Sequence, residues 1–421
     1  MTPEHQLKWL FLDLNSYFAS VEQQENPALR GRPVAVVPMN TDSTCAIAAS
    51  YEAKAYGVKT GTKIYEAKRM CPGLVCVLAQ HNKYVDYHHR ILEEVIHHVP
   101  IDRICSIDEL SSRLPPRQRT GEAGSAVAER IRKGIWRNVG AAINCSIGLA
   151  PNSFLAKVAT NMEKPNGLVI LAPDALPGRL FDLKLTDLPG INVRMEERLN
   201  RAKIRTVEQF WNISPKHARA IWGSVGGERF WYNLHGYDVP DIVTKTSVIG
   251  HSRVLDPDLR HPDAARLVTR RLVVKAASRL RRKEFYATCF SMSVRINGDQ
   301  RWAAEIRLSP AQDNFSFLKA LDVLWMKMIA DCRPEKIRKS AICLTGLCRR
   351  EEITPDLFDT NSDAYKKLRD KNDILSGVID GLNKKYGAET VRIGVSPKTS
   401  SGYVGTKIAF ARIPDKAEFR E

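Results

Sequence analysis

The amino-acid sequence predicts a multidomain protein of the α/β class, and three observations support this fold class. The length of 421 residues is enough for roughly two to four domains, each with a core of its own. Strand-like and helix-like segments alternate over most of the chain, which is typical of layered α/β folds. A stretch near the middle is helical throughout and separates two such regions.

The elements are expected in four segments. Residues 1–172 alternate strands and helices, whereas residues 174–240 form short helices punctuated by Pro and Gly. Residues 245–347 return to long strands with helices between them. Residues 351–421 are expected to be an appendage with a flexible entry, a polar helix and a short strand. The strands are expected at 8–12, 33–37, 144–148, 289–296, 302–308 and 402–407, and the helices at 85–98, 125–136, 262–282, 312–330 and 363–386.

The chain is strongly basic: 64 Lys and Arg residues face 47 Asp and Glu residues, which gives a formal net charge of +17. Such a charge predicts a polyanionic partner, with nucleic acid ahead of an acidic membrane because no basic amphipathic anchor is visible. No apolar run approaches the roughly 18 residues of a membrane span, and the nine cysteines include no C-x-x-C pair. We therefore expect a cytoplasmic protein without structural zinc or membrane insertion.

Acidic residues follow two apolar runs that are typical of strands. Asp13 ends the run 9–12, and Asp108 and Glu109 follow the run 101–105. Strands that present acids at one end can bring them together at one edge of a sheet, where their repulsion favours hard cations such as Mg²⁺ or Mn²⁺. Two such ions can assist phosphoryl transfer. The alternative is a turn at Asp13 and an ordinary exposed acidic pair.

Four motifs occur in order along the chain. They are FLDLNSYFASVE at 11–22, SYEAKAYGV at 50–58, SIDE at 106–109 and NMEKPNG at 161–167. Together they closely resemble the motifs of the Y-family translesion DNA polymerases, of the bacterial DNA polymerase IV and V type. The resemblance extends from the N-terminus to about residue 345, and four ordered motifs are far more specific than any one of them.

The resemblance implies a right-hand polymerase with an α/β palm, small fingers, an all-helical thumb with a helix-hairpin-helix and an α+β little finger. Residues 110–116 (LSSRLPP) replace the apolar strand that usually follows the acids, so the edge of the palm sheet is expected to differ there. The palm is expected at 1–23 and 81–172, the fingers at 24–80, the thumb at 173–240, the little finger at 245–347 and a C-terminal extension at 348–421.

The resemblance also implies the catalytic site. Asp13, Asp108 and Glu109 match the palm acids that bind two Mg²⁺ ions, with Mn²⁺ as a substitute, and the backbone carbonyl of Leu14 would complete the site. Asn15 stands where many relatives carry a second acid. Because that position is not one of the three metal-binding acids, catalysis is not expected to suffer.

A second set of residues is implied for the incoming nucleotide. Phe18 matches the steric-gate aromatic, which stacks under the sugar and clashes with a ribose 2′-hydroxyl. Tyr51 and Lys54 match fingers residues at the triphosphate, although relatives commonly carry Arg at the second position. Lys164 matches a palm lysine that reaches the β- and γ-phosphates. The amides of Tyr17 and Phe18, at a turn into a helix, are further phosphate donors.

Two shorter motifs lie outside the palm. TDLPGINV at 186–193 resembles a helix-hairpin-helix, in which Gly190 and Asn192 would let backbone amides approach a DNA phosphate without reading the base sequence. In the tail, TPDLF ends in Leu357 and Phe358 and resembles the short peptide that bacterial proteins insert into the sliding clamp, but the usual leading Gln is missing. The alternative for this pair is packing on its own domain.

The segment 245–350 carries 22 Lys and Arg residues against 10 Asp and Glu residues. Along 291–296 apolar and polar residues alternate, which predicts a strand with one buried and one polar face. Ser291, Ser293 and Arg295 are therefore expected on the polar face, where the resemblance to a little finger implies contact with DNA phosphates. Such binding should weaken steeply with salt.

The sequence thus predicts a template-dependent, low-fidelity DNA polymerase that performs translesion synthesis by two-metal nucleotidyl transfer. Primer–template DNA, deoxynucleoside triphosphates and the sliding clamp are the expected partners of a monomer that lies at the nucleoid when bound to DNA. One alternative is a non-catalytic polymerase-like scaffold in a mutagenesis complex, which would be expected to have lost an acid. A helix-hairpin-helix nuclease or glycosylase is the other, and it does not explain the motifs at 50–58 and 161–167.

Overall fold

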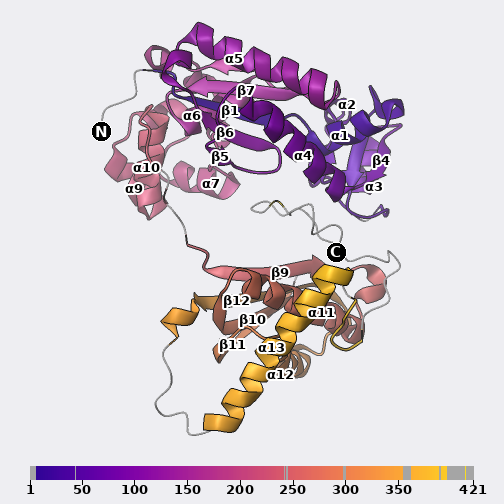
Figure 1. Ribbon diagram of the computed structural model, residues 1–421. Helices are drawn as coiled ribbons and strands as arrows, with labels where there is room; N and C mark the ends of the chain where they lie inside the picture. The colour runs from indigo at the N-terminus through magenta and orange to yellow at the C-terminus, as the bar shows by residue number, and fades with distance from the viewer. Residues whose placement is uncertain are drawn as a thin grey trace. The chain divides into compact units, whose positions relative to one another are not determined.

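The computed structural model describes residues 6–42, 44–240, 242, 245–296, 300–353, 362–387, 390–395 and 413. The chain divides into two compact units, the first made mainly of residues 1–241 and the second of residues 242–405. Each unit has its own sheets and helices (Figure 1). These findings confirm the predicted multidomain α/β class.

A five-stranded sheet, in the order β5-β6-β1-β7-β8, is central to the first unit. β1 is antiparallel to both of its neighbours, whereas β7 is parallel to β8. Leu10 and Leu12 on one face of β1 and Phe11 on the other are all buried, as expected for a central strand with both faces covered. The strands are β1 (Trp9–Leu14), β5 (Arg103–Ile104), β6 (Glu109–Arg113), β7 (Cys145–Ala150) and β8 (Leu168–Ile170).

Helices cover both faces of this sheet. A Cβ on Gly148 of β7 would meet α6, whereas a Cβ on Gly124 of α5 would meet Leu149, the next residue of the same strand. Because successive strand residues point to opposite faces, α6 and α5 lie on opposite sides of the sheet. The helices around it are α1 (Tyr17–Glu25), α4 (His81–Ile96), α5 (Gly121–Gly134) and α6 (Ser153–Met162).

A small separate sheet lies between α1 and α4 in the sequence. Its order is β3-β2-β4, with β2 antiparallel to β3 and parallel to β4. Its buried apolar residues form two small clusters, one that includes Ala35, Val37 and Ile64 and one that includes Ala53 and Val58. Its elements are β2 (Val34–Val37), β3 (Ala48–Ala49), α2 (Tyr51–Ala55), α3 (Ile64–Met70) and β4 (Val75–Leu78).

Residues 173–240 contain helices and turns, as predicted. Leu199 and Phe210 share one apolar core with Phe11 of β1 and with α6, so this segment packs on the central sheet. The α-helices α7 (Val193–Arg201), α8 (Val207–Trp211), α9 (Pro215–Trp222) and α10 (Val225–Leu234) follow the N-cap side chains of Asn192, Thr206, Ser214 and Ser224. Short 3-10 turns lie at Pro27–Leu29, Pro116–Gln118, Pro173–Ala175, Gly178–Asp182, Leu185–Asp187, Pro257–Leu259 and Arg350–Glu352, and a π-helical turn at Ile135–Val139.

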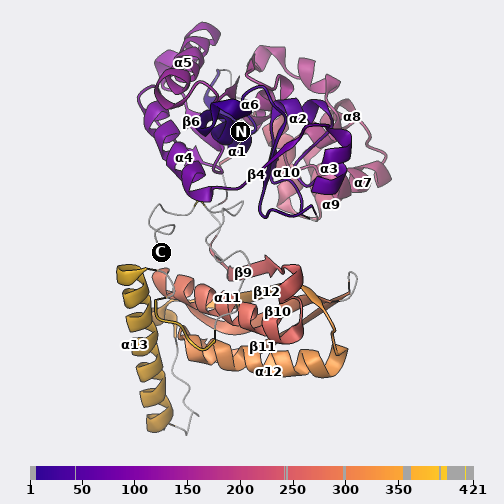
Figure 2. The same ribbon diagram turned by 90° about the vertical axis from the view of Figure 1, so that its right-hand side faces the viewer.

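The second unit is a four-stranded antiparallel sheet in the order β11-β10-β12-β9 (Figure 2). Phe290 of β10 stacks with Phe317 of α12, so the helices cover the face on which the apolar residues of β10 lie. Arg295 is exposed, which confirms the predicted alternation. The elements are β9 (Val248–Val254), α11 (Pro262–Arg282), β10 (Tyr286–Ile296), β11 (Arg301–Ala311), α12 (Asn314–Cys332) and β12 (Ile337–Cys348).

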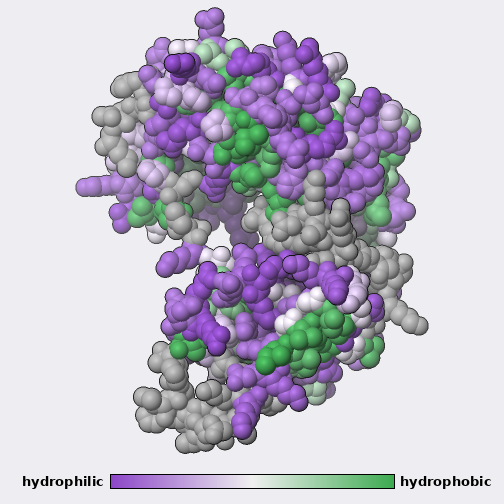
Figure 3. Space-filling model, viewed as in Figure 1, coloured by the Kyte–Doolittle hydropathy of each residue, from purple (hydrophilic) through white to green (hydrophobic). Residues whose placement is uncertain are grey.

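The C-terminal helix α13 (Ser362–Tyr386) confirms the helix expected at 363–386, and it is attached to the second unit. Asp380 accepts two hydrogen bonds from Arg281 of α11, at 2.8 and 3.0 Å, and the buried Ser376 Oγ accepts one from the Asn314 amide. The helix therefore packs on α11 and α12. Its outer face is apolar and exposed at Ile374 and Val378, and Figure 3 shows a hydrophobic patch on this unit. The strand expected at 402–407 lies outside the described residues.

The expectation for residues 110–116 is corrected. Residues 109–113 do form a strand, β6, and it lies between β5 and β1 in the interior of the sheet. Ser111 and Ser112 are almost completely buried. Their small side chains fit beneath the covering helices, so a polar sequence is compatible with an inner strand. Within the described part of the chain, no helix is long and apolar enough to cross a membrane.

Candidate active site

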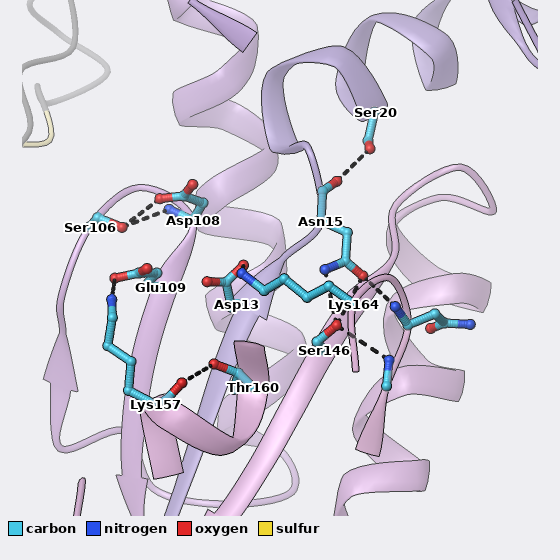
Figure 4. Close-up of polar contacts among 12 residues, drawn as sticks. Asp13, Asn15, Ser20, Ser106, Asp108, Glu109, Ser146, Lys157, Thr160 and Lys164 are labelled. Carbon is cyan, nitrogen blue, oxygen red and sulfur yellow. Dashed lines mark hydrogen bonds and ion pairs between the residues drawn. The ribbon is translucent and has the colours of Figure 1, made fainter. Parts of the chain in front are cut away.

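Three acids meet at one end of the central sheet (Figure 4). Asp13, near the end of β1, is the cross-strand partner of Glu109, the first residue of the antiparallel strand β6. The amide of Leu14 donates to the carbonyl of Asp108 at 2.8 Å, which ties the third acid to the same point. The register of β1 and β6 therefore places the acids predicted from the sequence together.

Two lysines pair with these acids. Lys164 Nζ lies 2.7 Å from Asp13 Oδ1, and Lys157 Nζ lies 2.5 Å from Glu109 Oε2. Lys157 also lies over the ring of Phe11, 5.1 Å from its centroid. Lys157 was not predicted from the sequence. A signal was present, since Lys157 is the one charged residue of helix α6.

Burial makes this cluster electrostatically costly. Asp13 is 7% exposed, and burial raises its pKa to about 6 against the opposing effect of the Lys164 ammonium. Burial also raises the pKa of Asp108, and the Glu109 carboxylate adds to that rise. Ser106 opposes it by donating a 2.5 Å hydrogen bond to Asp108 Oδ1. A cation at this point would relieve the repulsion among the carboxylates.

The donor set fits a hard divalent cation, since all of its side-chain donors are carboxylate oxygens. Within the described ranges, no three His, Cys, Asp or Glu side chains are close enough to hold a metal ion together. Instead, the ammonium groups of Lys164 and Lys157 supply the counter-charge to Asp13 and Glu109. Cation binding at these acids would replace the lysines.

The aromatic residues of α1 follow Asp13 closely in the sequence, and they pack on α4. Tyr17 is buried and its hydroxyl donates to the carbonyl of Tyr84 at 2.6 Å. Phe18 stacks on the ring of Tyr84, with centroids 4.2 Å apart and planes 12° from parallel. Tyr84, which the sequence did not reveal, is fully buried and donates to Glu22 at 2.6 Å. Phe18 is therefore held in a fixed plane.

The fingers candidates lie in the field of the same acids. Lys54 Nζ of α2 lies 4.3 Å from the ring centroid of Tyr51. Burial lowers the pKa of Lys54, and the charge of Lys164 lowers it further. Burial raises the pKa of Tyr51, with a contribution from Asp13. The structure thus brings both residues, along with Lys164, to the end of the sheet where Asp13 lies.

The helix-hairpin-helix candidates are arranged for access by backbone amides. Asn192 caps α7, and its side chain accepts a hydrogen bond from the Met195 amide at 3.0 Å. Gly190 has a φ of 98°, a conformation that other residues rarely adopt. Val193, the first residue of α7, is largely exposed. The turn therefore presents a helix start to the surface.

Basic residues lie side by side on the face of the second unit's sheet that the helices do not cover. Arg295 of β10 is the register partner of Arg301 on β11 and of Lys339 on β12. Ser293 lines the same hollow, and the Ser291 hydroxyl donates to the Cys343 carbonyl at 3.4 Å. A sheet face with several basic side chains suits an anionic partner.

His88 of α4 anchors the loop that carries the acids, and it was not found from the sequence. It is 4% exposed, and its Nδ1–H donates to the carbonyl of Ile107 at 2.8 Å, one residue before Asp108. Burial lowers the pKa of His88 from 6.5 to about 4. The folded protein therefore keeps a neutral imidazole at pH values where the unfolded chain binds a proton.

This pKa predicts a loss of stability at mildly acidic pH. Between pH 6.5 and about 4, His88 binds a proton in the unfolded state but not in the folded state. Its contribution to the free energy of unfolding, roughly 2–3 kcal/mol, is therefore complete above pH 6.5 and is lost as the pH falls toward 4. Urea unfolding of the wild type and of His88→Gln, measured from pH 4 to 8, checks this. The variant should show a shallower pH dependence, and identical slopes would contradict the expectation.

Comparison with known proteins places these features in context. The model of the impB/mucB/samB family matches residues 12–161, and that of the impB/mucB/samB family C-terminal domain matches residues 247–357. DNA polymerase IV of Moorella thermoacetica is 32% identical over 400 residues, covering 92% of this chain and 95% of that protein. DNA polymerase IV 1 of Bacillus subtilis is 28% identical over 398 residues, covering 92% of each.

Solved structures share the fold. A Y-family DNA polymerase chimera of Dbh and Dpo4 matches with a TM-score of 0.70 at 20% identity, covering 82% of this chain and 100% of that one. The insertion ternary complex of Dbh DNA polymerase matches with a TM-score of 0.53 at 22% identity, again over 82% and 100% of the two chains. At this identity the likeness shows the fold.

Proposed function

This chain belongs to the impB/mucB/samB family of Y-family DNA polymerases, and we propose that it extends a DNA primer across damaged template bases by nucleotidyl transfer. It is a DNA-directed DNA polymerase of the translesion class, as its relatives named DNA polymerase IV indicate. The observation that supports the catalytic assignment best is the cross-strand pairing of Asp13 and Glu109, with Asp108 tied to the same point.

The three acids are proposed to hold two Mg²⁺ ions, with Mn²⁺ as an alternative, together with the carbonyl of Leu14. When bound, such ions activate an attacking hydroxyl and stabilise the leaving phosphate oxygen. The protein's own residues position the reactants. Lys164, now 2.7 Å from Asp13, would turn to the β- and γ-phosphates of the incoming nucleotide, and this movement would free an acid for the cation.

The remaining nucleotide contacts are proposed from α1 and α2. The amides of Tyr17 and Phe18 lie in the first turn of α1, whose Ser16 cap makes no side-chain hydrogen bond to them. They are therefore available to triphosphate oxygens. Tyr51 and Lys54 would contact the triphosphate from the other side, where the ammonium supplies a point charge and no bidentate fork.

We further propose that the parts act as a right hand. Residues 1–23 and 81–172 would be the palm, 24–80 the fingers, 173–240 the thumb and 245–347 the little finger, with 348–421 as an extension. The partners would be primer–template DNA and deoxynucleoside triphosphates, and the solved insertion ternary complex of Dbh DNA polymerase supports these partners. The place of action would be the cytoplasm, at the nucleoid. Leu357 and Phe358, the clamp candidates, lie outside the described residues, and clamp pull-down with both changed to Ala tests them.

Sugar discrimination is predicted to depend on Phe18. The ring is fixed by stacking on Tyr84, so it can exclude a ribose 2′-hydroxyl by volume. Phe18→Ala should raise ribonucleotide insertion, relative to deoxynucleotide insertion, by about tenfold or more. Phe18→Tyr keeps the ring and should keep the discrimination. Single-nucleotide insertion assays with both sugars measure this, and an unchanged ratio in Phe18→Ala would remove the assignment.

DNA affinity is predicted to depend on the open sheet face of the second unit. Changing Arg295 and Lys339 to Ala should weaken binding of primer–template DNA and reduce the slope of log affinity against log salt by about 2. The control changes Lys319 and Lys327, two exposed lysines of α12 on the opposite side of the sheet. Equal losses in the two double variants would mean that binding reflects total charge only.

The overall proposal is tested by primer extension with Mg²⁺ on an undamaged template and on a template with an abasic site. Extension on both templates is the expected result. DNA binding without extension would favour the alternative of a non-catalytic scaffold. The presence of all three acids and of Lys164 argues against that alternative.

A further inference from the structure

Asn15 lies two residues after Asp13 and joins three parts of the first unit. It is 2% exposed, and its Nδ2 donates to the hydroxyl of Ser146 on β7 at 3.0 Å. Its Oδ1 accepts a hydrogen bond from the amide of Asn166 at 2.7 Å. The Ser146 hydroxyl in turn accepts from the amide of Gly167 at 3.3 Å. Figure 4 shows this network beside the acids.

The turn that Asn15 holds is tightly constrained. Asn166 has a φ of 59°, in the left-handed region. A Cβ on Gly167 would lie 1.8 Å from the Glu163 carbonyl oxygen, so the chain doubles back on itself there. Lys164 is part of this turn, and its ammonium reaches Asp13 at 2.7 Å. The orientation of the turn therefore decides where the ammonium of Lys164 can reach.

The chemistry of the position explains why an amide suits it. Asn15 offers a donor to Ser146 and an acceptor to the Asn166 amide at the same time. A carboxylate can only accept, and it would add a negative charge beside Asp13. An alanine would remove the acceptor of the Asn166 N–H and would leave the turn without this partly buried hydrogen bond.

We propose that Asn15 is a positioning residue for Lys164: its amide locks residues 164–167 against the ends of β1 and β7 so that the ammonium is aimed at the triphosphate. This inference rests on the proposed function. It goes beyond the expectation drawn from the sequence, which was that an Asn in place of the second acid would not harm catalysis. Asn15 acts through the turn and touches neither the acids nor the substrate.

A double-mutant cycle tests the inference. Asn15→Ala, Lys164→Ala and the double variant are compared in single-nucleotide insertion on undamaged primer–template. Asn15→Ala should raise the KM for the deoxynucleotide by about tenfold, as expected for the loss of a hydrogen-bond link to the turn, with DNA affinity unchanged. In the Lys164→Ala background the same change should alter KM by less than about twofold, because residues that act as one unit are not additive. Equal effects in both backgrounds would overturn the proposal.

Two further variants guard against general damage to the fold. Ser146→Ala breaks the link from its other side and should show the same direction and the same dependence on Lys164. Ser20→Ala removes a hydrogen bond of 2.7 Å to the Asn15 carbonyl but keeps the amide side chain. It should lower thermal stability without raising KM. A rise in KM that followed stability in all variants would contradict the assigned role.

Nucleotide binding separates this inference from the proposed function. Titration with a non-hydrolysable deoxynucleotide analogue and Mg²⁺ reports the contact of Lys164 with the triphosphate without requiring turnover. The inference is supported if Asn15→Ala weakens analogue binding in the wild-type background but not in the Lys164→Ala background. This holds even for a chain that does not extend primers. Normal extension with equal analogue affinity in wild type and Asn15→Ala overturns the inference alone. A wild type that neither extends primers nor binds the analogue overturns both.

Discussion

Asp108→Ala should abolish primer extension, with a fall in kcat of about a thousandfold or more, the scale expected when charge stabilisation at the reacting phosphate is removed. Among the three acids, Asp13 and Glu109 are paired with lysines, whereas the hydrogen bond of Asp108 comes from the neutral hydroxyl of Ser106. Its charge therefore contributes most directly to attracting a cation. Single-turnover insertion at saturating nucleotide measures the effect.

The same substitution should not harm folding. Burial and the neighbouring Glu109 raise the pKa of Asp108, so its charge is unfavourable in the cation-free protein. Its removal should leave thermal stability equal to or higher than that of the wild type, with DNA affinity retained. Asp102→Ala is the matched control, since that exposed acid lies only six residues away and contacts Arg113 at 3.8 Å. Retained activity in Asp108→Ala would contradict the catalytic assignment.

Gly148→Ala should destabilise the first unit by about 3 kcal/mol or more, at the upper end of overpacking effects. The new Cβ would lie 2.0 Å from the Ala156 carbonyl oxygen and 2.8 Å from both Ala159 Cβ and the Thr160 amide. Two of these three atoms belong to the backbone of α6, so no side-chain rotation relieves the clash. The helix itself must move away from β7.

That displacement should also reduce activity, because α6 carries Lys157 and leads into the turn with Lys164. Urea unfolding and primer extension on the same samples measure the two effects. Gly121→Ala is the control: its Cβ would lie 4.0 Å from a methyl group of Ile170, an ordinary contact at the start of α5. Similar stability in the two variants would show that α6 has more freedom than this packing implies.

Local patterns predicted most of the elements. The helix expected at 262–282 has those bounds in α11, and the alternation of β10 placed Arg295 on the exposed face. Asp13 lies at the end of the first apolar run as expected, whereas Glu109 begins the polar strand β6 that pairs with β1, and the second apolar run holds only the short strand β5. The features that were predicted depend on periodicity within a few residues, which the sequence displays directly.

Features that depend on tertiary contacts were missed. The run 110–113 lacks the apolar pattern of an inner strand because it contains Ser111 and Ser112. Both residues are nevertheless buried, since other parts of the fold cover them. Tyr84, His88 and Lys157 acquire their roles only through partners 19 to 66 positions away, such as Ile107, Glu109 and Phe18. No local pattern in the chain reports such distant pairings.

The pairing of Lys164 with Asp13 couples two binding equilibria. The lysine competes with a cation for the carboxylate, and the carboxylate competes with a triphosphate for the lysine. A nucleotide that draws Lys164 away raises the cation affinity of Asp13, and by reciprocity a bound cation raises the nucleotide affinity by the same factor. We therefore expect the cation dissociation constant, measured by titration, to fall when a deoxynucleotide is present, and to fall by a smaller factor in Lys164→Ala, where only direct contact between phosphate and cation remains.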